Sequence, residues 1–410
     1  MRSLRLQNFR SLGDTGRIEL RPLTVLVGAN NSGKSSFLRF FPLLRQTYEA
    51  RSASPLLWYG RDVDFGDFAQ AVRRGAEPRE IEIEFEVEGS QLRSATSLSE
   101  FDGKTFMVRH RLSTAHASFV MDFEPSGELR TFAVLEDEQP VRSFHGSLIK
   151  SFSTNGSLLP HHDGEHKTTG LPEGVERLAT NELLAARGSL EDTTPCVYIG
   201  PFRAPPERFY RVQELAVGHM DPHGENLAMF LRSLSPSQIE AFSSFALEHV
   251  GFRVRLRAEG MHVAILLEDE TGESYNLIDM GYGFSQVLPV IAQCWATASG
   301  WHPSERDPLP KLLAVEQPEL HLHPHYQAKL ADLFVGTIDA VPDSRLLVET
   351  HSEALVSRLG ELVEAGKLAS ERVSVLLFEQ DATTKVTSVR QSTFAPDGTL
   401  TNWPFGFFAP

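Results

Sequence analysis

One segment near the N-terminus has the residue types and spacing that hold the phosphates of a nucleotide. Residues 28–35 read Gly-Ala-Asn-Asn-Ser-Gly-Lys-Ser and match G-x-x-x-x-G-K-[ST] at every fixed position. Glycines let the backbone turn its amides toward phosphate oxygens, a lysine adds positive charge, and a serine offers a hydroxyl to Mg²⁺. We therefore expect ATP and Mg²⁺ to bind here, with Ser35 as a metal ligand. The expected nucleotide-binding residues are Gly28, Ala29, Asn30, Asn31, Ser32, Gly33, Lys34, Ser35 and Ser36.

A nucleotide site of this kind also needs a carboxylate at the end of a buried strand, to hold Mg²⁺ or its water. Glu316 follows four apolar residues, and His351 follows a second apolar strand that starts near residue 345. If these strands are parallel neighbours, both residues reach the carboxyl edge of the sheet that also carries the glycine loop, where α/β sheets bind ligands. We predict that Glu316 is a metal ligand and that His351 contacts the γ-phosphate.

A second glycine-rich segment, Gly281-Tyr-Gly-Phe-Ser-Gln286, leads into a helical pattern. Taken alone, this segment is read equally well as the cap of a helix. It contains no G-x-G-x-x-G, so a dinucleotide-binding fingerprint is not supported. The residues by themselves therefore indicate a helix start and nothing more specific.

The elements around these residues predict an α/β fold with a mostly parallel core sheet. Residues 3–9 and 18–27 read as strands leading into the glycine loop, and residues 35–45 have helical spacing that Pro42 should kink or shorten. Residues 80–135 alternate apolar and polar side chains, which predicts an antiparallel sheet with one wet face. After a predicted strand pair near 252–268, strands and helices alternate to about residue 390, as in a parallel sheet covered by helices.

The order of these patterns divides the chain into four predicted parts. Helical patterning returns at 178–188 and 225–250, where Ser235 and Gln238 occupy capping-box positions. Residues 150–175 are rich in Ser, Gly, His and Pro and predict a mobile insertion. The predicted domains are a nucleotide-binding core at 1–45 and 275–395, a β-rich subdomain at 46–200 with the insertion near 150–175, a helical lobe at 201–274, and an aromatic C-terminal tail at 396–410.

Composition favours a cytoplasmic protein without a membrane partner. No apolar run approaches the roughly 20 residues that span a bilayer, and the N-terminus lacks the apolar block of a signal peptide. The two cysteines, Cys196 and Cys294, lie far apart and lack CxxC spacing. This usage fits a reducing compartment and argues against a disulfide framework or a thiolate zinc site.

Charge argues against a general polyanion binder. The formal net charge is −15, from 39 basic and 54 acidic residues. Arg253, Arg255 and Arg257 alternate along a predicted strand and therefore share one face. A solvated sheet face explains them better than a nucleic-acid track does. DNA stays an alternative partner that the net charge does not support.

Taken in order, these segments resemble the ABC-type ATPase heads of structural-maintenance-of-chromosomes (SMC), RecF and overcoming-lysogenization-defect (OLD) proteins, above all bacterial AAA-family ATPases of the OLD-like kind. Leu4–Ser11 looks like the first strand of such a head, Gly28–Ser35 like the Walker A loop, Leu312–Glu319 like the Walker B strand, and His351 like the switch histidine. The resemblance covers residues 1–45 and about 275–380. It implies an ABC-type P-loop ATPase head with an antiparallel β subdomain and a helical insertion.

The resemblance also implies a head-to-tail homodimer with two ATP molecules at its interface. In such families the signature segment of one subunit closes over the γ-phosphate held by the other. Gly281, Gly283 and Ser285 match that signature. They would act on the nucleotide of the second subunit through backbone amides and a hydroxyl.

The Walker B segment departs from the family pattern at one position. Aligning Pro318 with the usual proline puts Glu316 in the metal position and Gln317 where most members carry a catalytic glutamate. A glutamine can position water but cannot take its proton, so we expect slow hydrolysis. Glu319 could substitute for the missing base. The catalytic candidates are therefore Glu316, Gln317, Glu319 and His351.

A second departure is His323, which stands where the D-loop aspartate of these families lies. With His321 and His325 it forms an H-x-H-x-H pattern that could be read as a set of metal ligands. Its place beside the Walker B strand, with Pro324 at a helix start, favours a loop at the dimer interface instead. We predict no transition metal.

The main functional hypothesis is an ATPase that hydrolyses ATP slowly and switches a separately encoded effector protein, in antiphage defence as the resemblance implies. One alternative is a non-hydrolysing, ATP-gated scaffold or sensor, which Gln317 motivates. A second is a DNA-repair ATPase of the RecF or SMC type, which the acidic balance and the lack of a long coiled-coil pattern count against. Only 59 residues follow His351, too few for the Toprim nuclease domain of OLD proteins.

Overall fold

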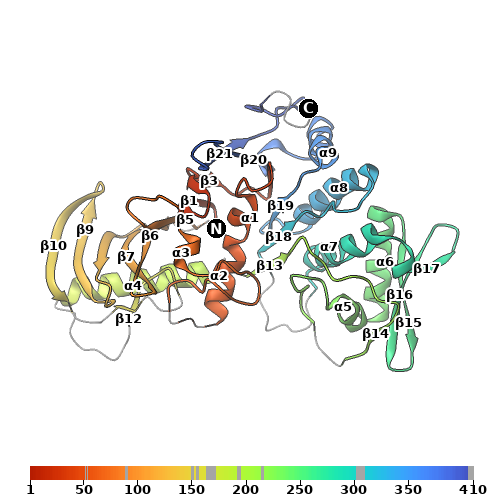
Figure 1. The fold of residues 1–410 in the computed structure, drawn as a ribbon, viewed down its shortest axis with the longest axis horizontal. Coiled ribbons are helices and arrows are strands. Elements are labelled where there is room, and N and C mark those ends of the chain that lie inside the picture. The colour runs from red at the N-terminus through yellow and green to blue at the C-terminus, as the bar shows by residue number, and fades with distance from the viewer. Residues whose placement is uncertain are drawn as a thin grey trace. The chain divides into compact units, whose positions relative to one another are not determined.

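A computed structural model (Figure 1) describes residues 1–50, 52, 54–87, 91–148, 152–153, 157–162, 172–191, 195–213, 217–301 and 310–404. The chain forms two compact units: unit 1 comprises Met1–Leu20, Ala29–Thr194 and Phe378–Arg390, and unit 2 comprises Arg21–Gly28, Pro195–Leu377 and Gln391–Pro410. The four predicted domains stay a prediction. The predicted insertion near 150–175 lies largely outside the described residues, as do residues 405–410 of the predicted tail. None of the described helices is long and apolar enough to cross a bilayer.

Unit 1 is built on a largely antiparallel sheet with the strand order β10-β9-β8-β7-β6-β5-β1-β2-β21, in which β3 also pairs with β1 and only the β2–β21 contact is parallel. A small β11–β12 pair stands apart from it. The strands are β1 (Ser3–Phe9), β2 (Leu12–Asp14), β3 (Ile18–Glu19), β5 (Ile81–Glu86), β6 (Arg93–Phe101), β7 (Lys104–Ser113), β8 (Ser118–Phe123), β9 (Leu129–Glu136), β10 (Gln139–Leu148), β11 (Phe152–Ser153) and β12 (His161–His162). A hairpin of β20 (Val373–Gln380) and β21 (Thr387–Ser392) carries residues 378–390 of this unit.

The antiparallel sheet predicted for residues 80–135 is confirmed, and its alternation has the expected cause. In β5 the side chains of Ile81, Ile83 and Phe85 are buried, while the glutamates between them are partly exposed. Those glutamates meet arginines on neighbouring strands, as in the contact of Arg93 Nη2 with Glu86 at 2.9 Å. One face of the sheet is therefore apolar and the other is wet.

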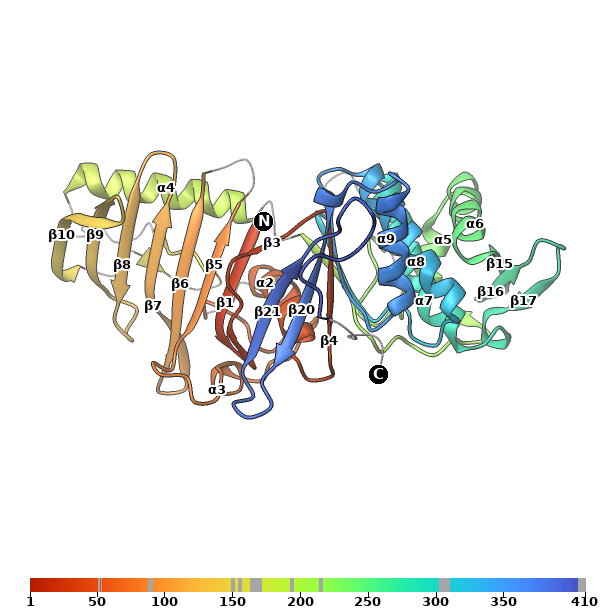
Figure 2. The same ribbon diagram turned by 90° about the horizontal axis from the view of Figure 1, so that it is seen from above.

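Helix α4 (Glu173–Glu191) lies along the antiparallel strands of unit 1 (Figure 2). Its buried residues are Ala179, Leu183, Ala186 and Leu190. Their spacing of three and four places them on one stripe of the helix, and the rest of α4 is largely polar. The helix thus packs against its surroundings in unit 1 through this one apolar face.

The helix predicted over residues 35–45 is interrupted. It consists of α1 (Lys34–Leu38) and α2 (Phe40–Glu49), which meet at Arg39. Pro42 lies in the first turn of α2, where the missing backbone N–H leaves no helical bond unmade. A short helix α3 (Phe68–Ala71) follows in unit 1.

Unit 2 contains the predicted parallel sheet and confirms the α/β class. Its strand order is β4-β19-β18-β13, and every contact is parallel. The strands are β4 (Leu23–Gly28), β13 (Cys196–Ile199), β18 (Leu312–Glu316) and β19 (Arg345–Glu349). The single strand predicted over 18–27 is wrong in one respect: residues 20–22 separate β3 from β4. Pro22 lacks a backbone N–H for continuous strand pairing.

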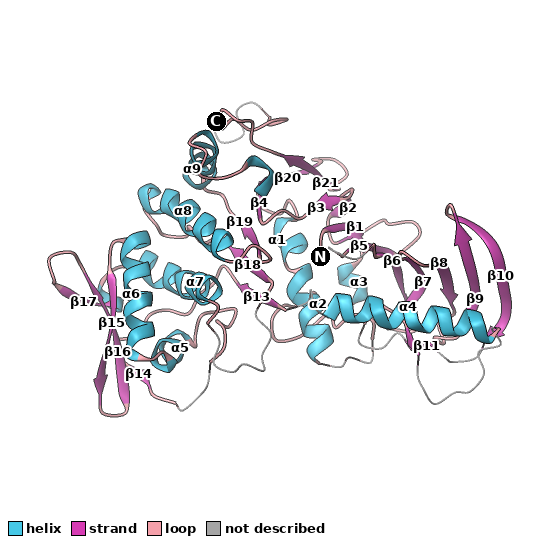
Figure 3. Ribbon diagram, turned by 180° about the vertical axis from the view of Figure 1, so that it is seen from behind, coloured by secondary structure: helices cyan, strands magenta, loops and turns pink. Residues whose placement is uncertain are grey.

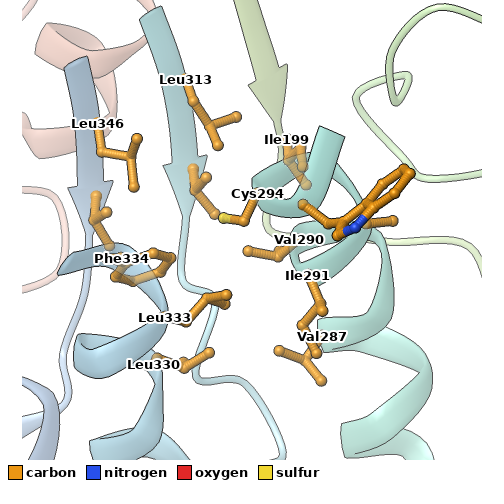
Figure 4. Packing of buried hydrophobic residues seen from close by; sticks show 14 of the residues in the cluster. Ile199, Val287, Val290, Ile291, Cys294, Leu313, Leu330, Leu333, Phe334 and Leu346 are labelled. Carbon is orange, nitrogen blue, oxygen red and sulfur yellow. The ribbon is translucent and has the colours of Figure 1, made fainter. Parts of the chain in front are cut away.

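The helices of unit 2 pack with this parallel sheet around a large apolar core (Figure 3). The helices of unit 2 are α5 (Leu227–Ser233), α6 (Pro236–Val250), α7 (Tyr282–Ser299), α8 (Pro324–Ala340) and α9 (Glu353–Glu364), with 3₁₀ turns η1 (Leu277–Asp279) and η2 (Ser370–Arg372). Figure 4 shows side chains of α7, α8, β18 and β19 meeting in that core; they include Val287, Val290, Ile291, Cys294, Leu313, Leu330, Leu333, Phe334 and Leu346. This packing holds the helices and the strands that carry the candidate site.

A second, antiparallel sheet in unit 2 packs beside α6. Its order is β14-β16-β15 with β17 on β16, and its strands are β14 (Tyr210–Arg211), β15 (Arg253–Glu259), β16 (His262–Glu268) and β17 (Ser274–Asn276). The predicted capping box of α6 is confirmed: the Ser235 hydroxyl accepts from the Gln238 N–H, and the Gln238 side chain accepts from the Ser235 N–H. Near the C-terminus, Phe394, Leu400 and Trp403 pack against the core of this unit.

Candidate functional site

The predicted phosphate loop begins where β4 ends. Gly28, Asn31 and Gly33 have positive φ angles of 153°, 64° and 91°, which turn the chain through a tight loop before α1. The Ser32 N–H donates to the Ala29 carbonyl at 3.3 Å. Lys34 Nζ donates to the same carbonyl at 2.9 Å, so the ammonium group lies across the loop. The loop therefore has the tight backbone turn that a phosphate cradle would need, and phosphate binding there stays a prediction.

The lack of a side chain at Gly33 is needed for packing. A Cβ atom there would lie 2.7 Å from the Ser11 hydroxyl and 3.0 Å from Leu12 Cδ2. Its φ of 91° would also strain any residue with a side chain. The first β-turn of unit 1 therefore fits tightly against the end of the loop.

Two residues from the distant C-terminal hairpin brace this loop within unit 1. Gln380 Nε2 donates to the Asn31 carbonyl at 3.2 Å. The Thr387 N–H donates to the Ser11 carbonyl at 2.7 Å, and the two hydroxyls lie 3.1 Å apart. Nothing in the local sequence around Gln380 or Thr387 signals these contacts. Gln380 is separated from Asn31 by 349 positions and Thr387 from Ser11 by 376, so the contacts depend on the fold.

The parallel register of unit 2 brings the predicted carboxylate and histidine segments to one edge. Glu316 ends β18 opposite Glu349 of β19, and Glu349 lies opposite Leu26 of β4. Gly28, two residues after Leu26, ends β4 at that same edge. The loop after β19 carries His351, whose side chain is exposed. The sheet thus assembles the start of the phosphate loop, the Walker B carboxylate and the histidine loop, as α/β sheets do at their carboxyl ends.

Glu316 is buried and held by a tyrosine that sequence reasoning missed. It is 1% exposed, and its Oε1 accepts from the Tyr198 hydroxyl at 2.8 Å. Tyr198 lies on β13, which pairs with β18. A carboxylate oriented by a phenol at a strand end is a suitable hard-oxygen ligand for Mg²⁺. Within the apolar run Cys-Val-Tyr-Ile, nothing marks Tyr198 as polar support.

The main chain turns sharply after Glu316, and an arginine holds the turn. Gln317 has φ of 44°, and its N–H donates to the Glu349 carbonyl at 2.7 Å. Arg203 Nη2 donates to the Glu316 carbonyl at 2.6 Å, and Nη1 to the Gln317 carbonyl at 3.4 Å. Burial lowers the pKa of Arg203 to about 10, against the opposing influence of the carboxylates Glu319 and Glu316. The guanidinium therefore remains charged at neutral pH.

Glu319 links the Walker B segment to the histidine loop. Its Oε1 accepts from the His351 N–H at 2.7 Å, while its Oε2 is buried without a hydrogen-bond partner among the described residues. Burial raises the pKa of this carboxyl above the ordinary value of 4.5, and the hydrogen bond from His351 acts in the opposite direction. A buried carboxyl with a raised pKa is a candidate proton acceptor.

Gln327 of α8 fastens the same two loops a second time. Its Nε2 donates to the Leu322 carbonyl at 2.9 Å, and its Oε1 accepts from the Ser352 hydroxyl at 2.7 Å. Ser352 also caps α9 by accepting from the Leu355 N–H at 3.1 Å. The loop around His351 is thus tied to two helices and to the segment after Glu316.

The predicted signature segment forms the start of α7, with Gly281 as its cap at φ 83°. The Gly283 backbone packs against the loop after β18: a Cβ atom there would lie 2.5 Å from the His321 carbonyl oxygen. Tyr282 and His321 also meet edge to face, with ring centroids 5.5 Å apart. The Ser285 hydroxyl donates to the Tyr282 carbonyl at 2.8 Å, so the side chain is turned toward its own helix.

His323, at the predicted D-loop position, has a structural role in α8. Its Nδ1 accepts from the His325 N–H at 3.3 Å and caps the helix, with Pro324 in the first turn. Within the described ranges no group of three or more His, Cys, Asp or Glu side chains could hold a metal ion. The hydroxyl of Ser35, in unit 1, and the carboxylate of Glu316, in unit 2, are each hard oxygen donors of the kind that Mg²⁺ prefers.

A protein-family model matches most of the chain. The model of the family described as "AAA domain, putative AbiEii toxin, Type IV TA system" matches residues 23–357, which is more than half of the chain. The matched range includes the phosphate loop, the signature segment, Glu316 and His351. No curated protein matches the chain.

Solved structures of SMC head domains are similar to the chain at low sequence identity. An SMC head domain from Thermotoga maritima has 12% identity and a TM-score of 0.40, and the alignment covers 95% of this chain and 98% of that one. A second structure, of an SMC head bound to the C-terminal winged-helix domain of ScpA, has 13% identity and a TM-score of 0.42, with coverage of 96% and 97%. A third, an SMC head with an extended coiled coil bound to the C-terminal domain of ScpA, is derived from Pyrococcus furiosus; it has 12% identity and a TM-score of 0.41, with 96% of each chain covered.

Glu319→Gln should stabilise the fold by about 1–2 kcal/mol at neutral pH, because an amide costs less to bury than a carboxylate. The raised pKa means that the ionised form is disfavoured in the folded chain relative to the unfolded chain. This penalty is absent below the ordinary pKa of 4.5 and grows as pH rises through the raised value. Thermal unfolding across a pH series should therefore show that the variant is more stable than the wild type at neutral pH and that this difference disappears at acid pH. The exposed Glu364→Gln is the control, and an equal gain at every pH would contradict the assignment.

Proposed function

Since the chain belongs to the AAA-domain family described above, we propose that it binds Mg²⁺ and ATP at Gly28–Ser36 and hydrolyses the nucleotide slowly in a head-to-tail homodimer. The observation that carries the proposal is the shared sheet edge: Gly28 begins the phosphate loop at the edge where Glu316 and the His351 loop end their strands. A phosphate cradle and a magnesium carboxylate at one edge are the two requirements of P-loop phosphoryl transfer.

The proposed roles follow from the chemistry of each group. ATP supplies the phosphoanhydride bond that water cleaves. Lys34 offers positive charge to the β- and γ-phosphates, and Ser35 and Glu316 offer oxygen ligands to Mg²⁺. Gln317 orients water through its amide, and His351 contacts the γ-phosphate.

Glu319 is the proposed proton acceptor in place of the glutamate that the family pattern has at position 317. The support is its buried Oε2, which has no partner among the described residues, and the pKa that burial raises. Transfer of the proton of the attacking water to Glu319, two positions further along the chain than the usual glutamate, should be slow. The proposed enzyme is therefore a switch with long-lived nucleotide states.

The proposed dimer brings the signature segment of one subunit to the nucleotide of the other. Gly281 and Tyr282 are exposed at the start of α7, and the free backbone amides of a helix start favour an anion. Because the Ser285 hydroxyl already donates to the Tyr282 carbonyl, we assign the contact across the dimer mainly to the amides near Gly281 and Gly283. Ser285 would join as an acceptor or after rotating.

We propose that the ATP state of this dimer controls a separately encoded effector in bacterial antiphage defence. The support is the description of the family, which names a toxin of a toxin–antitoxin system. A cytoplasmic location is part of the proposal, because both cysteines are buried thiols, which fits a reducing compartment. The effector should bind one nucleotide state of the dimer more tightly than the other.

A non-hydrolysing ATP sensor is the second candidate, and Gln317 favours it. An amide at the position of the usual base cannot accept a proton. In that case ATP binding alone would close the dimer.

A DNA-repair role is disfavoured by the pairing of the basic strand β15. Arg253 and Arg255 both contact Glu240, at 3.1 and 2.6 Å, and Arg257 contacts Glu259 at 2.8 Å. Phosphate binding on this face would need positive charge that these carboxylates already balance. The net charge of −15 acts in the same direction.

Lys34→Ala should abolish ATP binding and phosphate release, because it removes the charge that compensates the β- and γ-phosphates. Calorimetry with Mg²⁺ and ATP and a colorimetric phosphate assay measure the two effects. Lys367→Ala, at an exposed lysine far along the chain from the loop, is the charge-matched control. Wild-type binding without turnover would select the sensor, and no wild-type binding would refute both candidates.

The wild type and Lys34→Ala also test whether an effector protein binds in an ATP-dependent way. Co-purification from the native host with ATP should retain a specific protein on the wild type and lose it from Lys34→Ala. A partner retained equally by both would contradict ATP control of the interaction.

Gln317→Glu should raise the turnover number by about tenfold or more, since a well-placed general base is worth that much or more. Phosphate release under single-turnover conditions is the measurement. Glu319→Gln provides the opposite comparison and should lower turnover, because it removes the proposed proton acceptor. Unchanged or lower turnover in Gln317→Glu would show that position 317 does not face the attacking water.

Mixing two inactive variants tests the head-to-tail dimer. Lys34→Ala removes the positive charge of the phosphate loop. Gly281→Asp places a negative charge at the signature segment, where a Cβ atom has no neighbour within 4 Å. An equal mixture should recover about a quarter of wild-type turnover, since random pairing makes half of the dimers mixed and each then has one intact site. Circular dichroism controls for folding of Gly281→Asp. No recovery from two folded, exchanging variants would refute the shared site.

A further inference from the structure

Arg203 is a buried cation whose hydrogen bonds go to the main chain. It follows β13 in the segment Gly200-Pro-Phe-Arg203 and is only 5% exposed. Its two terminal nitrogens donate to the carbonyls of Glu316 and Gln317, at 2.6 and 3.4 Å. Its Nε is buried without a partner among the described residues. Burying a guanidinium with one nitrogen unpartnered is energetically costly. Apolar packing alone would not require a charge at this position.

The two carbonyls that Arg203 holds are those of the proposed metal ligand and the proposed water-orienting residue. The direction of a side chain depends on the φ and ψ angles of its own residue. Gln317 has φ of 44°, a left-handed conformation that residues with a side chain adopt at an energetic cost. A planar fork that grips consecutive carbonyls can maintain such a turn, and a lysine ammonium cannot match that geometry.

The backbone of Arg203 also contacts the signature helix. Gln286 of α7 is buried, and its Nε2 donates to the Arg203 carbonyl at 3.4 Å. Arg203 is therefore bonded on one side to the turn after β18 and on the other side to the helix that begins at Gly281. A shift of α7 would therefore be transmitted to the Glu316–Gln317 turn through Arg203, in addition to the direct packing of Gly283 on the loop after β18.

We propose that Arg203 is a positioning residue, which sets the orientation of Glu316 and Gln317 by holding their main-chain oxygens and couples that orientation to α7. This role rests on the proposed ATPase function. It differs from a merely structural one, because it requires the fork geometry of the side chain and not only its size or its charge.

Arg203→Lys is the decisive variant, because it keeps the charge and loses the fork. The turnover number should fall by about tenfold or more, since small misplacements of reacting groups have effects of that size. The affinity for ATP should stay within about twofold of the wild-type value, because the substitution leaves the phosphate loop that binds the nucleotide unchanged. The Mg²⁺ concentration for half-maximal phosphate release should rise by at least about threefold, because Glu316 would keep its hydrogen bond from Tyr198 but lose the contact that holds its main chain. Arg203→Met, which also loses the charge, should show a turnover at least as low.

Arg21 provides a matched control within the same unit. Its Nη1 also donates to two main-chain carbonyls, those of Ser370 and Val373, at 2.8 and 3.0 Å. It lies just before β4, at the amino end of that strand, whereas the candidate site lies at the carboxyl end. Arg21→Lys should change thermal stability without changing turnover or the Mg²⁺ requirement.

Several outcomes would overturn the proposal. Wild-type turnover and Mg²⁺ dependence in Arg203→Lys would show that charge or packing is sufficient. Equal losses in Arg21→Lys would show a general loss of stability. If Arg203→Met fails to fold, the result for Arg203→Lys still decides. If the wild type itself shows neither turnover nor Mg²⁺-dependent ATP binding, the proposed function fails first, and the role of Arg203 falls with it.

Discussion

The parallel register of β4, β19 and β18 is the constraint on which the candidate site depends. Pairing of Leu26 with Glu349 and of Glu349 with Glu316 fixes which residues stand at the carboxyl edge. A shift of one residue would turn every side chain of a strand to the opposite face. The apolar core under these strands, formed with α7 and α8, makes such a shift costly, and so the chemistry of the edge is specified by packing far from it.

Polar groups behind this edge are arranged as a connected network that leaves few alternative arrangements. Tyr198 orients Glu316, the His351 N–H holds Glu319, and Gln327 ties the two loops that carry them. Buried ionisable groups are expensive unless their partners are in place, and a network of this kind favours one conformation over its neighbours. Two of the buried atoms without a hydrogen-bond partner among the described residues, Glu319 Oε2 and Arg203 Nε, belong to residues with proposed roles in hydrolysis. Buried polar atoms of this kind are often found at active sites, which agrees with the proposed roles.

The sequence predicted the parts of this site that rest on local rules. The loop at Gly28–Ser35, the strand before Glu316 and the capping box at Ser235 each depend on residues close together in the chain, and their spacing is informative. The antiparallel strands of residues 80–135 were predictable for the same reason, because alternation reports one buried face. The interruption of the helix at Arg39 agrees with the kink expected from Pro42. The separation of β3 from β4 shows where local periodicity is insufficient, because the structural effect of Pro22 depends on neighbouring elements.

The supporting residues could not be predicted, because their partners come from distant parts of the chain. Tyr198 is separated from Glu316 by 118 positions and Gln380 from Asn31 by 349. Arg203 lies in a short loop whose sequence resembles many surface turns. Such contacts exist only once the sheet order is known, and a pattern of neighbouring residues contains no record of them. Composition and motif therefore identified the groups that could contact a nucleotide, and the fold identified the groups that hold them.

The close approach of Gly283 to the His321 carbonyl has a consequence for how this sequence can change over evolution. Even a methyl group at position 283 would collide with main-chain atoms, which cannot move aside as a flexible side chain can. Substitutions there can be tolerated only when the loop after β18 is rebuilt at the same time, so the two segments should diversify together or not at all. Among distant relatives, correlated variation between these positions would indicate that the same close contact is kept.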